Sequence, residues 1–324
     1  MKYLAMFPAG ADRVVIQVLE GNNATIVRSD ESSVLFTTPK ELSADQLLFA
    51  NNVFEILVVT KRKSIDGSVE KLVQALGDNS IPRSGTFRTM CHFDGRLAPM
   101  SPASRRTLER ALARRGAKFT PRGGGSEFWV IGRRDWPDVV LGRRMDLGRK
   151  GKGAKGALSP QIAWLLASLS SPTPSDVVFD PFAGSGAILE ARARWKYREL
   201  VYNDAEHNDA SAKLRLRNLR SFHIDVLAGA PPVKNVNKII TDPPWGEYEE
   251  VGMPYADFTS KWWQSTASCR SPGGGSLVVL VNRTNESALI EALSRLDVEI
   301  ERSAPLLING HPAAAVCGSW PARS

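Results

Sequence analysis

The chain has 324 residues, of which 43% are hydrophobic and 23% charged, and its formal net charge is +8 at pH 7. This length predicts two domains, and the composition is typical of a globular protein rather than a disordered chain. No apolar run reaches the roughly 18 residues of a membrane span, and Pro8, Gly10 and Asp12 interrupt the first apolar stretch, so neither a membrane helix nor a signal peptide is expected.

The N-terminal region, residues 1–147, alternates short strand and helix patterns. Strands are expected at 14–19, 24–28, 34–37, 53–60, 86–92 and 127–131, and helices at 69–76 and 101–115. We therefore predict a smaller N-terminal α+β domain. The next segment, GRKGKGAKG at 148–156, has four glycines and no apolar side chain larger than alanine, which predicts a mobile basic junction.

The C-terminal region, residues 157–324, alternates strands and helices more regularly. Strands are expected at 176–180, 200–203, 223–226, 238–241, 276–281, 298–302 and 313–318, and helices at 160–169, 188–195, 208–219, 256–269 and 285–296. Seven strands with intervening helices predict a mostly parallel, doubly wound, Rossmann-like α/β domain whose helices cover both faces.

Basic residues gather in two places, and such clusters suit a polyanion such as RNA. The residues that we expect to contact phosphates are Arg105, Arg106, Arg110, Arg114 and Arg115 in the helix at 101–115, and Arg149, Lys150 and Lys152 in the junction. Charge alone equally fits a solvated helix face and a flexible linker.

Four aspartates follow successive predicted strands of the C-terminal domain. The first, Asp180, begins the turn DPFAGSG at 180–186, whose glycines allow a ligand to approach the backbone closely. The others are Asp204, Asp225 and Asp242, the last within DPPW at 242–245. Any one of them is equally well explained as a helix cap. All four together predict a ligand site at the carboxyl edge of the sheet.

Cysteines and histidines show no ligand pattern. The three cysteines are far apart and the four histidines lack metal-binding spacing, so we expect no metal and a reducing, cytoplasmic location.

The succession of DPFAGSG and DPPW resembles the class I methyltransferases that modify amino groups. The run GALSPQIAWLLASLSSPTPSDVVFDPFAGSGAILE at 156–190, together with KIITDPPWG at 238–246, most closely resembles the THUMP-containing tRNA guanine-N2 methyltransferases. The resemblance covers about 145–320, and TFRTMCHFDGR at 86–96 and GRRM at 142–145 look like matching parts of the RNA-binding half.

This resemblance implies S-adenosylmethionine as the cofactor. It implies that Asp180, Ala183, Gly184 and Gly186 hold the methionine part, Asp204 the ribose hydroxyls, and Asp225 and Val226 the adenine, with Ser159, Pro160 and Gln161 closing the pocket.

The chemistry of DPPW fits the same activity. An aromatic amino group is a poor nucleophile because its lone pair is delocalised, and two acceptors, the Asp242 carboxylate and the Pro243 carbonyl, can hold its hydrogens and orient the lone pair. The prolines, Pro243 and Pro244, stiffen the turn, and Trp245 can stack on a base that has left its own stack.

We therefore expect methylation of an exocyclic amino group in RNA, with guanine N2 in tRNA as the leading target. Adenine-N6 methylation of ribosomal RNA or DNA stays open because DPPW also occurs in adenine modifiers, and so does a catalytically silent RNA-binding paralogue. RNA is the expected partner, no membrane is involved, and nothing in the sequence indicates an activating subunit.

Overall fold

The computed structural model describes residues 1–78, 84–121, 125–148, 158–206, 210–246, 252–308 and 310–322. They form two compact units, one made of Met1–Phe7 and Leu19–Arg149 and the other of Pro8–Val18 and Lys150–Ser324. No described helix is long and apolar enough to cross a bilayer.

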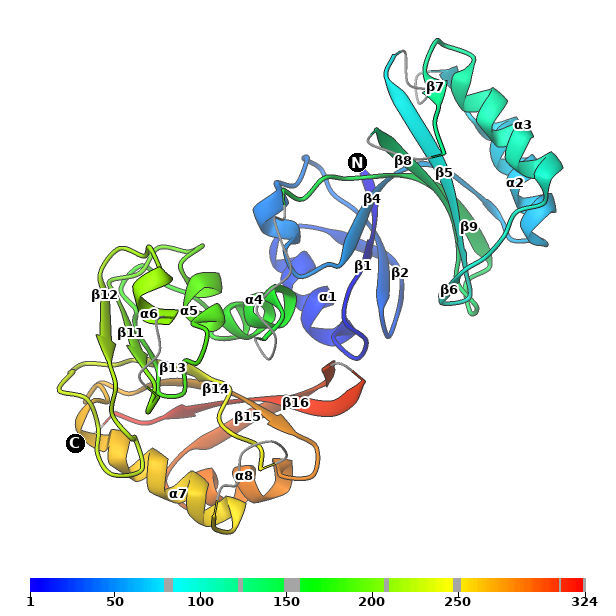
Figure 1. The fold of residues 1–324 in the computed structure, drawn as a ribbon. Coiled ribbons are helices and arrows are strands. Elements are labelled where there is room, and N and C mark those ends of the chain that lie inside the picture. Colours follow the sequence, from blue (N-terminus) through cyan, green and yellow to red (C-terminus); the bar gives the residue numbers. More distant parts are fainter. Residues whose placement is uncertain are drawn as a thin grey trace. The chain divides into compact units, whose positions relative to one another are not determined.

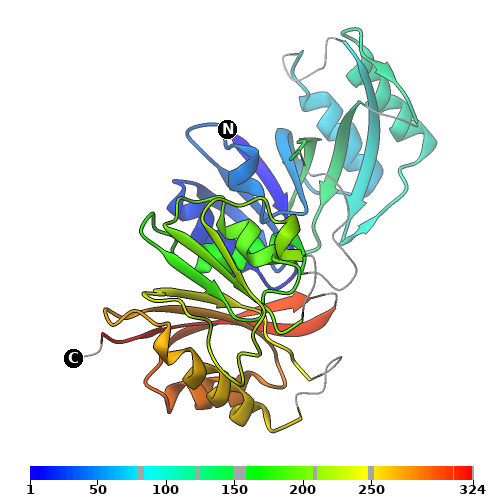
Figure 2. The same cartoon turned by 60° about the vertical axis from the view of Figure 1, so that its left-hand side comes forward.

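The first unit is a mixed sheet covered by two helices. Its strands are β1 (Lys2–Met6), β2 (Thr25–Asp30), β3 (Ser33–Thr37), β4 (Asn52–Lys61), β5 (Thr86–Phe93), β6 (Arg96–Leu97), β7 (Lys118–Phe119), β8 (Ser126–Gly132) and β9 (Asp138–Arg144). Their order is β2-β3-β1-β4-β9-β8-β5-β6, with β7 beside β5. Figure 2 shows α2 (Ile65–Ala75) and α3 (Pro102–Ala113), in blue and green-cyan, side by side against one sheet face.

One N-terminal prediction was wrong. Residues 14–19 were expected to be a strand, but they belong to α1 (Asp12–Gly21). Ala11, Val14, Val15 and Leu19 are all buried, and their spacing of three and four residues places them on one helix face. The β-branched valines suggested a strand, and the packed helical face overrides that preference.

The second unit is built on a seven-stranded sheet. Its strands are β10 (Val177–Asp180), β11 (Glu199–Asn203), β12 (Leu219–Phe222), β13 (Lys238–Thr241), β14 (Gly275–Asn282), β15 (Glu299–Ile308) and β16 (His311–Trp320). Their order is β12-β11-β10-β13-β14-β16-β15, and only the pairs that involve β16 are antiparallel. This confirms the predicted doubly wound α/β class.

Helices cover both faces of this sheet. Figure 1 shows α7 (Tyr255–Ser265) and α8 (Glu286–Ser294) on one side, and α4 (Pro160–Leu169) and α5 (Ala187–Arg192) on the other. Trp262 and Trp263 of α7 are both buried in the core between the helices and the sheet. Ser159 caps α4, because its hydroxyl accepts a hydrogen bond from the amide of Ile162 at 3.3 Å, and Pro160 follows in the first turn.

The third strand begins earlier than predicted, and the helix before it is shorter. A helix was expected at 208–219, but α6 covers only Ala210–Lys213, and β12 replaces the strand expected at 223–226. Asn218 has a φ of +49°, which a helix interior does not accommodate, and its carbonyl accepts a hydrogen bond from the amide of Leu200 in β11. The chain therefore joins the sheet at Leu219, which leaves Asp225 in the loop after the strand.

Candidate active site

Asp180 ends β10 and is completely buried. One carboxylate oxygen, Oδ1, accepts hydrogen bonds from the Thr241 hydroxyl at 2.7 Å and from the Phe182 amide at 3.2 Å, while Oδ2 has no partner among the described residues. Burial raises the pKa of Asp180 to about 8, the two hydrogen bonds oppose this, and the charges of Asp242 and Asp204 add to it. The carboxyl groups after three strands thus influence one another electrostatically.

The glycine turn after Asp180 is hydrogen-bonded to the end of β11 and has free space beside it. Gly184 has a φ of +48°, and a Cβ added there would meet no atom within 4 Å. Its amide donates to Asp204 Oδ2 at 2.7 Å, and its carbonyl accepts from the Tyr202 hydroxyl at 2.7 Å. Asp204 Oδ1 accepts from the Glu206 amide at 2.9 Å, so each carboxylate oxygen still has a lone pair for a ligand hydroxyl.

The loop that carries Asp225 is held by Asn203, a residue that the sequence patterns did not reveal. The buried Asn203 amide donates to the carbonyls of Pro181 and Ile224 at 3.1 and 2.9 Å, and its oxygen accepts from the Ile224 amide. Asp225 is exposed, and the adjacent Val226 is buried. The sequence signal that could have revealed Asn203 is its position as a polar residue at the end of the apolar strand LVYN.

Asp242 directly follows β13, beside Asp180, because the hydroxyl of Thr241 binds the Asp180 carboxylate. Burial raises the pKa of Asp242 to about 7, and the Trp245 indole opposes this shift. No described residue donates a hydrogen bond to the Pro243 carbonyl. The turn therefore presents two oxygen acceptors next to the glycine turn.

The loop after β14 supports this turn from the next strand. The Asn285 side-chain amide donates to the Trp245 carbonyl at 2.8 Å, and the Asn285 backbone amide donates to Asn282 Oδ1 at 3.0 Å. Asn285 stands at the start of α8 but makes no side-chain cap there. Its side chain holds Trp245 instead, a role that depends on strand order and was not apparent from the sequence.

The remaining cofactor candidates lie at the start of α4. Ser159 is exposed and Gln161 partly buried, and the Ser159 hydroxyl is already used to cap its helix. No hydrogen bond within the described ranges joins either residue to the strand-end carboxylates. Their assignment to the cofactor pocket stays a prediction.

The basic residues of the first unit divide into two groups. Arg105, Arg106 and Arg110 are exposed on α3 and make no ion pair with a described residue. Arg114 binds the carbonyl of Leu76 and the carboxylate of Asp78, and Arg115 donates to the Asp78 carbonyl at 2.7 Å. The predicted contacts Arg149, Lys150 and Lys152 lie outside the described residues.

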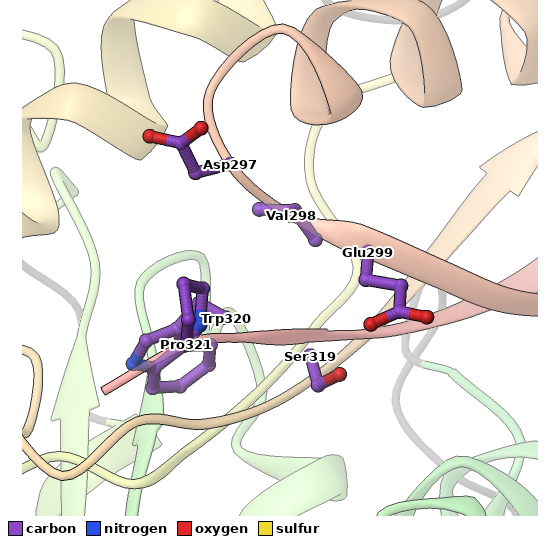
Figure 3. A pocket seen from close by; sticks show the side chains of 6 residues that line it. All are labelled: Asp297, Val298, Glu299, Ser319, Trp320 and Pro321. Atoms are coloured by element: carbon purple, nitrogen blue, oxygen red, sulfur yellow. The ribbon is translucent and has the colours of Figure 1, made fainter. Parts of the chain in front are cut away.

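A surface pocket of about 350 Å³ lies far from these carboxylates. Figure 3 shows its lining, which comes from the start of β15 and the end of β16: Asp297, Val298, Glu299, Ser319, Trp320 and Pro321. Trp320 pairs with Gly275 at the first residue of β14, so this pocket lies at the amino edge of the parallel strands. Asp180 and Asp242 lie at the opposite, carboxyl edge, where doubly wound sheets bind ligands.

The geometry brings four loops together at one sheet edge. These loops follow β10, β11, β12 and β13. Asp180 ends β10, and Asp204, Asp225 and Asp242 lie in the loops after the other three strands. Thr241 and Asn203 link neighbouring loops directly. The described residues contain no group of three or more side chains suited to a metal ion. The arrangement offers hydrogen-bond acceptors for a polar organic ligand next to acceptors for a second, amino-bearing group.

The sequence is similar to that of two curated mammalian proteins. It is 30% identical over 183 residues to U6 snRNA (guanine-N(2))-methyltransferase THUMPD2 of Bos taurus, covering 52% of this chain and 36% of that protein. It is 24% identical over 311 residues to the Mus musculus protein of the same name, covering 90% of this chain and 56% of that protein. The chain thus spans from about a third to just over half of these relatives. No protein-family model matches it.

Solved structures share the whole fold. TrmN from Thermus thermophilus superposes with a TM-score of 0.75 over 98% of this chain and 99% of its own, at 21% identity. The SMU.472 protein, solved with SAH, superposes with a TM-score of 0.69 over 100% and 98%, at 13% identity. The second unit has the Rossmann-like fold of methyltransferases, and the matches extend through the first unit as well.

Proposed function

We propose that this protein is an S-adenosylmethionine-dependent methyltransferase that acts on the N2 amino group of a guanine in RNA. The observation that supports it most directly is the position of the Asp242 turn beside the glycine turn, through the hydrogen bond from Thr241 to Asp180. The relatives named guanine-N2 methyltransferases support the choice of base.

The residues at the sheet edge fit the cofactor. Asp180 Oδ2 is buried without a described partner and would accept a hydrogen bond from the cofactor's amino group. The open side of Gly184 leaves room for the ligand, Asp204 has free lone pairs for ribose hydroxyls, and the exposed Asp225 would accept from the adenine amino group beside the buried Val226. When bound, the cofactor supplies a methyl group on an electrophilic sulfonium.

Asp242 and Pro243 would orient the amino group. The carboxylate and the carbonyl each accept one N–H hydrogen, which turns the nitrogen lone pair away from the base ring and toward the cofactor side of the site. Asp242 performs this role as a carboxylate, and its pKa of about 7 leaves it partly protonated at neutral pH. A positive charge bound beside it lowers that pKa and favours the accepting form.

The substrate is expected to be a structured RNA. Both relatives are named for U6 snRNA, whereas the sequence motifs led to tRNA as the expected target. Both RNAs therefore belong in the test. The exposed arginines of α3 are proposed to contact phosphates, which would position the RNA without reading its sequence.

The test compares the wild-type protein with Asp242→Ala, using labelled S-adenosylmethionine and either total tRNA or U6 snRNA. The modified nucleoside is identified by mass after digestion, and we expect N2-methylguanosine. Loss of a preorganised transition-state contact typically costs about 10²–10³ in rate, so Asp242→Ala should be at least about 100-fold slower. Its cofactor Kd should stay within about twofold of wild type.

The matched control is Glu291→Ala, which removes an exposed carboxylate of α8. This variant should keep full activity. A fully active Asp242→Ala variant refutes the catalytic role of the turn. N6-methyladenosine as the product refutes the choice of base. Failure to bind the cofactor in calorimetry refutes the enzyme and favours a silent RNA-binding protein.

A further inference from the structure

The hydroxyl of Tyr255 is buried and has no hydrogen-bond partner among the described residues. Tyr255 is the first residue of α7, directly after Pro254. Buried polar atoms in folded proteins nearly always have a partner, and an exception calls for an explanation such as a ligand that completes the site. The location of this hydroxyl indicates which ligand group that is.

Aromatic packing connects Tyr255 to the glycine turn of the candidate active site. Its ring lies 5.6 Å from that of Phe258, and the Phe258 ring lies 5.7 Å from that of Phe182. Phe182 belongs to the glycine turn, and its amide binds Asp180. Tyr255 is thus held by a row of rings that ends at the cofactor side of the site.

Tyr255 is also close enough to Asp242 to experience its charge. Burial raises the pKa of the Tyr255 hydroxyl above its ordinary value, and the negative charge of Asp242 raises it further. The hydroxyl therefore keeps its proton and is available as a donor near the acceptors of the Asp242 turn.

A guanine held by its amino group on Asp242 brings a specific acceptor to this place. In guanine the N2 amino group is flanked by N1, which carries a hydrogen, and by N3, which has a free lone pair. Of these two flanking ring atoms, only N3 can accept a hydrogen bond from a protonated tyrosine. We propose that the Tyr255 hydroxyl donates a hydrogen bond to N3 of the target guanine and thereby helps to select and align the base. This inference rests on the proposed guanine-N2 activity.

The contact can be tested by changing both of its partners. Wild type and Tyr255→Phe are each assayed with a transcript that carries guanosine or 3-deazaguanosine at the methylated position, because 3-deazaguanine replaces N3 with C–H. A buried hydrogen bond lost from one side reduces kcat/KM by about tenfold. We expect that loss for Tyr255→Phe on guanosine and for wild type on 3-deazaguanosine, with little further loss when both changes are combined.

Tyr197→Phe is the matched control. The Tyr197 hydroxyl is exposed and donates to the Arg217 carbonyl at 2.8 Å, just before β11 and therefore at the opposite sheet edge. This control should behave like wild type, and the cofactor Kd and the thermal midpoint of Tyr255→Phe should show that the variant is folded.

The outcomes separate the two proposals. A wild-type protein that leaves guanine in RNA unmethylated overturns the guanine-N2 activity and the Tyr255 contact with it. If wild type methylates guanine but Tyr255→Phe is equally fast, the Tyr255 contact alone is wrong. It is also wrong if Tyr255→Phe loses the same factor on guanosine and on 3-deazaguanosine, since the hydroxyl then acts on something other than N3.

Discussion

Asp180 combines complete burial with one carboxylate oxygen that no described residue satisfies. Such a group is costly to ionise in the free protein, as its pKa of about 8 indicates. The same oxygen is available to a ligand that carries positive charge or hydrogen-bond donors. At this position the free protein gives up stability that binding can restore.

The raised pKa predicts a pH-dependent stability. The folded-state pKa of Asp180 is about 8 and its ordinary value is 3.8, so the folded protein holds the proton more tightly than the unfolded chain. The resulting stability is fully present below about pH 4 and is lost as the pH rises through about 8. Between pH 5 and pH 8 the urea midpoint of the cofactor-free protein should therefore fall.

Asp180→Asn should flatten this fall, because the amide does not titrate. A smaller decrease should remain, owing to Asp242, whose pKa is about 7. Asp257→Asn, which changes an exposed residue of α7, should leave the wild-type profile unchanged. Parallel profiles for wild type and Asp180→Asn would show that this burial does not control stability.

At the scale of elements, the loop after β14 acts as a support for the Asp242 turn. The Asn285 amide holds the Trp245 carbonyl, and the bond fixes one end of the turn that carries both proposed acceptors. A small displacement of an aligned group strongly reduces rate, even when ligand binding is unchanged. We therefore expect Asn285 to act as a positioning residue in the proposed reaction.

Asn285→Ala should lower kcat, while cofactor affinity stays near that of wild type. One lost hydrogen bond is worth about 0.5–1.5 kcal/mol, which corresponds to roughly 2- to 12-fold in rate. Thr284→Ala changes an exposed residue of the same loop and is the control. An equal loss in cofactor affinity, or in stability, for Asn285→Ala would assign Asn285 to general folding instead.

The sequence was sufficient to predict the elements with a clear hydrophobic period. Six of the seven strands of the second unit were expected where they lie, and only the third is displaced. Asp180 ends β10, and Asp204 and Asp242 directly follow β11 and β13, the strands to which they were assigned. The polar partners of this site were missed. Thr241, Asn203 and Asn285 act through contacts that exist only once the strand order is known.

The wrong predictions at 14–19 and at 208–219 have the same origin. Tertiary contacts, rather than local preference, decide the structure of short segments. The valines of α1 favour strands in isolation, yet the helical spacing of its buried residues decides the structure. The helix α6 ends at Lys213, and the left-handed residue Asn218 directly precedes β12 where a helix was expected to continue. Neither effect has a strong signature in one sequence.

At the scale of the whole molecule, positive charge that is free of ion pairs is found on α3 of the first unit. Arg105, Arg106 and Arg110 are exposed there, whereas Arg114 is engaged by Asp78. Among the described residues of α3, these three arginines are the ones that we expect to neutralise phosphates. This refines the set suggested by charge alone.

Reversing all three charges to Glu should weaken RNA binding and reduce its salt dependence. Each lost phosphate contact removes about 0.7–0.9 from the slope of log K against log salt, so three contacts remove roughly 2. The control reverses Lys196, Arg198 and Lys234, three exposed cations that precede β11 and β13 at the amino edge of the second sheet. Titrations at several salt concentrations measure both slopes, and equal slopes would remove α3 from the RNA-binding surface.

The grouping of Pro8–Val18 with the C-terminal unit affects how the protein can be divided. The amide of Leu307 in β15 donates to the Ala9 carbonyl at 3.0 Å, and Arg302 binds the side chain of Gln17. The polypeptide passes into the second unit, out of it and back again. A fragment that starts at residue 157 would lose the segment that contacts the edge strand β15. Separating the second unit by a single cut would therefore leave this edge strand exposed and prone to aggregation.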